Sequence, residues 1–95
     1  MTVHFSPKAE SDFQLAEEWY EDQQEGLGQE FFNELNAVVE AISIHPKLFQ
    51  VRYKDVRVGY LNRFPFVVHY RSDHQRLTII AVFHTSLAPK HWKGR

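Results

Sequence analysis

The sequence has 95 residues, a formal net charge of −1 at pH 7, and 43% hydrophobic and 15% aromatic residues. This composition favours a single packed domain over residues 1–95 and argues against a disordered chain, while the absence of cysteine excludes disulfides, thiolate catalysis and cysteine-ligated zinc. No apolar run approaches the roughly 20 residues that span a bilayer, and the N-terminus lacks a secretory pattern, so we expect a cytoplasmic protein without membrane contact.

The first half of the sequence predicts a short strand and two helices. Val3-His4-Phe5 alternates as a strand does, and Ser6 followed by Pro7 is a typical helix start. Apolar spacings of three and four predict one helix to about residue 25, a break at 26–28, and a second helix that Pro46 ends. The apolar stripes are Ala9, Phe13, Ala16 and Tyr20, then Phe31, Leu35, Val38 and Ile42.

The second half predicts strands, because the apolar period changes to two after a loop at residues 47–54. We expect the side of the first two strands that faces the helices to carry Val56, Val58, Tyr60, Phe66, Val68 and Tyr70. A turn at 72–75 leads to the apolar run 77–83, typical of a central strand covered on both faces. The predicted fold is α+β: an N-terminal strand and a two-helix antiparallel hairpin packed on a small, mainly antiparallel sheet with a C-terminal three-stranded meander.

The charge of the chain is divided between its halves. Residues 1–50 contain two Lys/Arg and ten Asp/Glu, whereas residues 51–95 contain nine Lys/Arg and two Asp/Glu. We expect eight acids of the two helices to form the solvated outer face of the helical hairpin: Glu17, Glu18, Glu21, Asp22, Glu25, Glu30, Glu34 and Glu40. Because local potential steers association, the second half is the predicted binding surface for an acidic partner, which would mask it.

The candidate site residues lie in this basic half. Alternation gathers three arginines and a histidine on the strand face opposite the apolar set, where they could meet a protein partner or hold phosphate. Such a face can also be basic for solubility alone. His84 could act as an acid or base or cap its strand, and Trp92 could fold over the sheet edge. The predicted partner-binding residues are Arg57, Arg63, His69, Arg71, His84, Lys90, Trp92 and Arg95.

Other catalytic signatures are missing from the sequence. Gly26-x-Gly28 has no third glycine and follows no strand, so it is not a dinucleotide-binding loop. The histidine spacings match no standard metal motif, and Ser86 near His84 has no third partner in the pattern. We therefore expect no metal site and no cofactor.

A series of short motifs runs in order along nearly the whole chain. They are Phe5-Ser6-Pro7, Ala9-x-x-Asp12, Trp19-Tyr20, Gly26-Leu27-Gly28, Phe31-Phe32, Ile44-x-Pro46, Phe49, Arg63-Phe64-Pro65-Phe66-x-x-x-Tyr70, Ile79-x-Ala81-Val82-Phe83-His84 and Pro89-x-x-Trp92-x-x-Arg95. Their order and spacing resemble the ParE branch of the RelE/ParE toxin superfamily. The resemblance implies the toxin of a type II toxin-antitoxin (plasmid stabilisation) module, in a hetero-oligomer with its antitoxin.

The resemblance leaves three activities open. ParE-like members inhibit DNA gyrase by protein binding, which is the activity we predict. RelE-like members are metal-free ribonucleases that cleave messenger RNA, which the near-neutral charge disfavours. The third alternative is an inactive toxin-fold subunit that only binds its partner, since Leu87 stands where the ParE pattern has arginine. The residues that could serve a ribonuclease are His69, His84, Arg57, Arg63 and Arg71.

Overall fold

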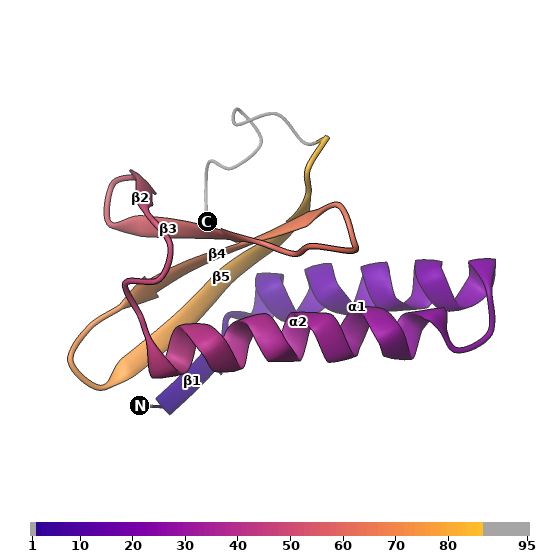
Figure 1. The fold of residues 1–95 in the computed structure, drawn as a ribbon, viewed down its shortest axis with the longest axis horizontal. Helices are drawn as coiled ribbons and strands as arrows, with labels where there is room; N and C mark the ends of the chain where they lie inside the picture. The colour runs from indigo at the N-terminus through magenta and orange to yellow at the C-terminus, as the bar shows by residue number, and fades with distance from the viewer. Residues whose placement is uncertain (1, 87–95) are drawn as a thin grey trace.

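In the computed structural model, which describes residues 2–86, two helices pack on one face of a sheet (Figure 1). The element order is β1 (Thr2–Phe5), α1 (Pro7–Gln23), α2 (Leu27–Ile44), β2 (Val51–Tyr53), β3 (Val56–Tyr60), β4 (Phe66–Ser72) and β5 (Arg76–His84). The described strands lie side by side as β1-β5-β4-β3-β2, with β1 parallel to β5 and the other pairs antiparallel. The predicted α+β fold is confirmed. Strand β2 was missed, because its three residues lie in the predicted loop.

The helix boundaries follow from local chemistry. The Ser6 hydroxyl accepts a hydrogen bond from the Ala9 amide at 3.1 Å, with Pro7 as the first helical residue. Gly26, at φ 87°, precedes α2 in the left-handed region that glycine tolerates. The sequence predicted that Gly28 lies in the break between the helices, but Gly28 lies in the first turn of α2. Helix α2 ends at Ile44, two residues before Pro46, as predicted.

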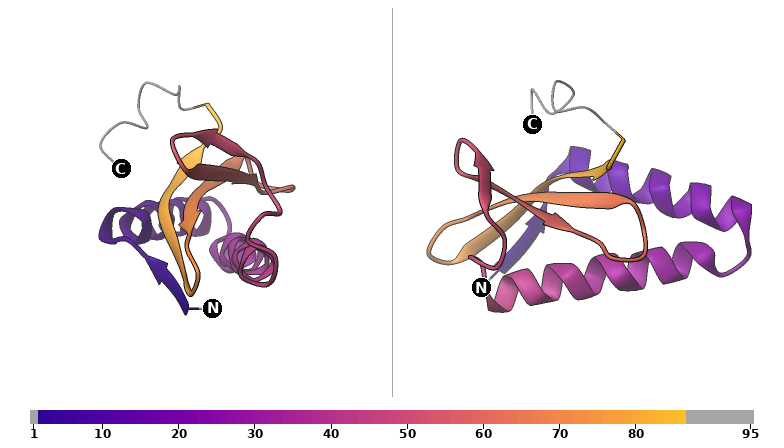
Figure 2. Two further views of the ribbon diagram at one scale, coloured as in Figure 1. Left: turned by 90° about the vertical axis from the view of Figure 1, so that its left-hand side faces the viewer. Right: turned by 45° about the horizontal axis from the view of Figure 1, so that its top comes forward.

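The two helices form an antiparallel hairpin that extends past the sheet at its tip (Figures 1 and 2). One carboxylate closes this tip: Glu21 accepts hydrogen bonds from the amides of Gly26 at 2.8 Å and Gly28 at 3.0 Å. These are amides at the N-terminus of α2, which would otherwise lack partners. Glu21 was predicted to be a solvated surface acid, so the structure gives it an additional, structural role.

The main core lies between the hairpin and the sheet. Phe31, Leu35 and Ile42 are buried there as predicted, and Val39 is more buried than Val38. The buried side of α2 thus runs with spacings of four, four and three. The residues that flank the stripe on α1 stay at the surface: the exposed fraction is 64% for Leu15 and 58% for Trp19.

A second, smaller core covers the face of the sheet away from the helices. It contains Val56, Val58, Val67, Ile80, Ala81 and Phe83, with Tyr53 packed beside them. Strand β5 therefore contributes to both cores, which confirms the prediction of a central strand covered on both faces. An irregularity of the β4–β5 register between His69 and Tyr70 turns both Ile80 and Ala81 to this second face.

Polar side chains tie the layers together. The Asp12 carboxylate of α1 accepts a hydrogen bond from the Val82 amide of β5 at 3.0 Å. The Tyr70 hydroxyl of β4 donates to the Pro46 carbonyl oxygen at 2.8 Å, and burial raises the pKa of this hydroxyl. No helix within residues 2–86 has both the length and the apolar character needed to cross a membrane.

Candidate functional site

The three candidate arginines are engaged in separate places. Arg57 donates to the Phe49 carbonyl oxygen at 2.7 Å. Arg63, in the β3–β4 loop, forms an ion pair with Glu30 of α2, and its amide donates to Glu34 at 3.1 Å. These two acids were predicted to lie on the solvated face of the hairpin, but they fix the loop to α2.

Arg71 forms a second ion pair, between its Nε and the Asp55 carboxylate at 2.8 Å. Asp55 belongs to the tight turn between β2 and β3, where Lys54 has φ 47°. The Arg71 guanidinium, first through its hydrogen bond, holds the pKa of the Asp55 carboxyl below its ordinary value. The pair thus joins the end of β4 to the turn that precedes β3.

The two candidate histidines differ in environment. His69 is fully buried in the second core, where its Nδ1 lies 2.7 Å from the Tyr53 hydroxyl and its ring meets Phe83 edge-on. His84 is exposed at the end of β5. Its Nδ1 accepts a hydrogen bond from the Ser86 amide at 3.1 Å and lies 2.8 Å from the Ser86 hydroxyl. His69 is therefore part of the packing, and His84 is the histidine that solvent reaches.

The predicted common face of Arg57, Arg63, His69 and Arg71 is wrong. In the β3–β4 register Arg57 lies opposite Tyr70, on the helix side, and Val58 lies opposite His69, on the far side. Even-numbered residues of β3 therefore share a face with odd-numbered residues of β4. The sequence-based prediction had instead placed the even-numbered residues of both strands on one face. The error places Val56 and Val58 in the second core instead of against the helices.

The remaining predicted site residues, Lys90, Trp92 and Arg95, together with the departure at Leu87, lie outside the described residues. Of the predicted set, the structure describes Arg57, Arg63, His69, Arg71 and His84. Their proposed part in partner binding stays a prediction.

An apolar cleft that the sequence analysis missed opens beside His84. It has a volume of about 430 Å³ and is lined by Ala16, Trp19 and Tyr20 of α1 and by Pro65, Phe66 and His84. The His84 ring packs edge-on against Phe66, with 5.2 Å between ring centroids. Trp19, a large aromatic residue beside the apolar stripe of α1 and not within it, is the signal in the sequence that could have indicated this cleft. A cleft of this kind suits an apolar side chain of a protein partner.

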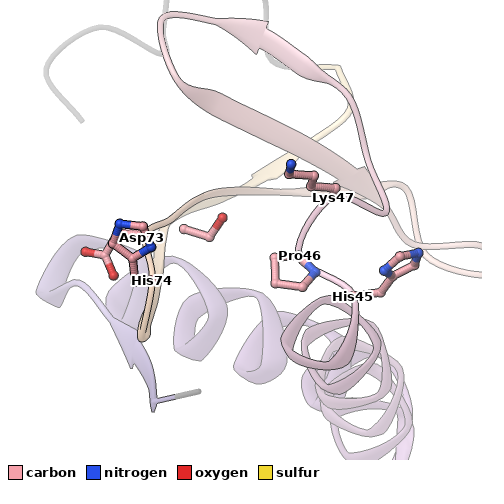
Figure 3. Close-up of a pocket in the computed structure, with 6 residues that line it drawn as sticks. His45, Pro46, Lys47, Asp73 and His74 are labelled. Atoms are coloured by element: carbon pink, nitrogen blue, oxygen red, sulfur yellow. The ribbon is translucent and has the colours of Figure 1, made fainter.

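A second cavity, of about 490 Å³, lies between the end of α2 and the β4–β5 turn (Figure 3). It is lined by His45, Pro46, Lys47, Ser72, Asp73 and His74. His45 points away from the side on which Asp73 and His74 lie, so the two imidazoles do not converge (Figure 3). Within residues 2–86 no group of three or more His, Asp or Glu is placed to hold a metal ion.

The lowered pKa of Asp55 predicts a pH dependence. A carboxyl whose pKa is depressed by folding stabilises the protein above its ordinary pKa, and this contribution is lost as pH falls through the lowered value. We expect Arg71→Met to raise the pKa of Asp55 and to reduce the loss of stability in this acidic range, as measured by NMR titration of the carboxyl groups and by denaturant unfolding at several pH values.

Asp73 is the internal control for this titration. The pKa of Asp73 is also lowered, mainly by hydrogen bonds from the amides of Gln75 and Arg76. Because these donors are backbone groups of the β4–β5 turn, the pKa of Asp73 should be the same in Arg71→Met. An unchanged pKa of Asp55 in the variant would show that the ion pair with Arg71 is absent in solution.

The described residues thus form a small α+β domain, in which a helical hairpin covers one face of the sheet and an apolar cleft opens between α1 and the β3–β4 loop. A family model described as "ParE toxin of type II toxin-antitoxin system, parDE" matches residues 3–89. The chain therefore belongs to the ParE toxin family of type II toxin-antitoxin systems, and antitoxin proteins are the partners of such toxins.

The fold is also similar to that of a solved structure, "Chromosomal ParDE TA system from P. aeruginosa". The TM-score is 0.63 at 17% sequence identity, and the match covers 88% of this chain and 95% of that chain. At this identity the likeness concerns the fold alone. A search of curated proteins gave no match.

Proposed function

We propose that this toxin acts in the cytoplasm by binding a protein, with DNA gyrase as its target, and that it does not cleave RNA. The proposal is supported by the positions of four of the five residues that a ribonuclease would use. Arg57, Arg63 and Arg71 bond to three different groups of the protein itself, and His69 is buried. Phosphate cleavage needs basic groups and an acid or base that converge on one scissile bond.

The exposed aromatic groups beside His84 fit a toxin that binds a protein better than they fit a ribonuclease. The apolar cleft of Trp19, Tyr20 and Phe66 opens to the surface, with His84 at its rim. Aromatic side chains beside a desolvated pocket are the usual anchors of protein interfaces. We further propose that residues 1–95 act as one domain and that the antitoxin forms a hetero-oligomer with it, covering part of the basic half.

Expression of the toxin with and without its antitoxin tests the mechanism. We expect growth arrest and a DNA damage response in cells that express the toxin alone, with intact transcripts, and inhibition of gyrase supercoiling by the purified chain. Arg63→Ala and His84→Ala should leave transcripts unchanged and retain growth arrest within about tenfold, because neither residue is required for a bond-breaking step. His69→Ala is a poor test, since it would damage the second core.

Two outcomes would contradict the proposal. Transcript cleavage that His84→Ala abolishes in a folded variant would instead identify a ribonuclease. Growth without arrest, although the purified chain still binds its antitoxin, would identify an inactive partner-binding subunit. Circular dichroism of each variant serves as the folding control.

A further inference from the structure

The described part of the chain ends beside the apolar cleft. The Thr85 amide donates a hydrogen bond to the Pro65 carbonyl oxygen at 2.8 Å. The Ser86 amide donates to Nδ1 of His84 at 3.1 Å. Pro65 and His84 both line the cleft. The residues that follow Ser86 in the sequence therefore start at the rim of this cleft.

The walls of the cleft favour an aromatic occupant. Its volume is about 430 Å³, and its aromatic walls are Trp19 and Tyr20 from α1 and Phe66 from β4. Trp19 is 58% exposed, although large apolar side chains are usually buried. A ring placed against Trp19 and Phe66 would remove apolar surface from water and add ring-to-ring contacts.

The sequence after Ser86 contains one such ring. Residues 87–95 lie outside the described residues, and Trp92 is the one Phe, Tyr or Trp among them. Trp92 is six residues beyond Ser86, and an extended chain of that length reaches at most about 20 Å. A tether this short gives Trp92 an effective concentration on the order of mM at the cleft. Even a weak contact is then formed in a large share of the molecules.

Charge favours the same contact. Residues 87–95 contain three Lys/Arg and no Asp/Glu, whereas α1 contains one lysine and six Asp/Glu. No ion pair within residues 2–86 involves an acid of α1. The helix that forms one wall of the cleft therefore has a negative potential, which attracts a basic segment.

We propose that residues 87–95 fold back and place the Trp92 indole in the apolar cleft, against Trp19 and Phe66, with the basic side chains of the segment toward the acids of α1. The contact is made within one copy, so it holds whatever the target of the toxin is. Under the proposed function, a protein partner displaces Trp92 before its own side chain enters the cleft.

NMR spectroscopy of the isolated, isotopically labelled chain tests the proposal. We expect nuclear Overhauser effects between the Trp92 indole and the rings of Tyr20 and Phe66. Contacts of the indole with Val58 and Val67 of the second core would overturn the proposal, as would an indole that contacts neither surface. Effects found only between labelled and unlabelled copies in a mixture would also overturn it, because Trp92 would then bind a second copy.

Two variants of α1 show whether the cleft holds the segment. Trp19→Ala removes one wall and should lower the equilibrium constant for docking about tenfold or more, as loss of a central aromatic anchor does. Leu15→Ala is the matched control, because Leu15 is 64% exposed on the same helix and does not line the cleft. Nuclear Overhauser effects of Trp92 and ¹⁵N relaxation of residues 87–95 measure the loss.

Equal docking in the two variants would contradict the proposal, provided that both keep the spectrum of the folded chain. These measurements use the isolated chain and record no toxicity. Failure of the docking proposal and failure of the proposed action on gyrase are therefore distinguished.

Discussion

Replacement of Phe31 by alanine should lower the free energy of unfolding by about 3–5 kcal/mol. Phe31 is fully buried at the centre of the main core, and its ring lies within 5.3 Å of the rings of Tyr20, Phe64 and Phe66. Truncation would remove contacts to α1, to the β3–β4 loop and to β4 together. The surrounding rings are held by different elements, so they cannot all move to fill the cavity. Urea unfolding followed by tyrosine and tryptophan fluorescence measures the loss.

Phe32 is the matched control, because it is the next residue of the same helix and has the same side chain. It is 36% exposed, and the nearest ring with which it interacts, that of Phe13, lies at 6.3 Å. We expect Phe32→Ala to cost no more than about 1.5 kcal/mol, since most of its surface change occurs next to water. Equal losses of unfolding free energy for the two variants would mean that α2 does not turn Phe31 toward the core and Phe32 toward the surface.

The sequence predicts the helices well because their signals are local. The Ser6-Pro7 start, the stop before Pro46 and the apolar stripes all act within a few residues of one another. The main difference, Val39 buried in place of Val38, arises because both positions lie within the width of one helical face. Which of two neighbouring valines turns inward depends on how α2 is rotated against the sheet, and the sequence of the helix does not contain that angle.

The candidate site was harder to predict because it depends on long-range register. Period-two alternation predicts that Arg57 and Val58 face opposite sides of β3, but it does not state which side meets the helices. The side of β3 that faces the helices depends on the register with β4, which the loop from Leu61 to Pro65 sets. The pairing of Arg63 with Glu30, 33 residues apart, likewise follows from the packing of the loop on α2. The apolar cleft requires α1 and that same loop to meet.

Gly28→Ala should destabilise the protein by about 1–3 kcal/mol, opposite in sign to the usual effect of this change in a helix. Alanine normally favours a helix over glycine by up to about 1 kcal/mol. Here a methyl group on Gly28 would lie 2.6 Å from the Glu17 carbonyl oxygen of α1. A backbone atom cannot rotate away as a side chain can, so the two helices must separate at the hairpin tip.

Separation of α1 and α2 would also disturb the hydrogen bonds at the tip of the helical hairpin. The Glu21 carboxylate, which holds the amides of Gly26 and Gly28, would lie 3.0 Å from the added methyl group. Gln29→Ala, at the next and exposed position of α2, is the control and should change stability by no more than about 0.5 kcal/mol. Denaturant unfolding of both variants measures the difference. A Gly28→Ala variant as stable as the wild type would mean that α1 and α2 are farther apart at Gly28 than this structure places them, because only a wider gap admits the methyl group without strain.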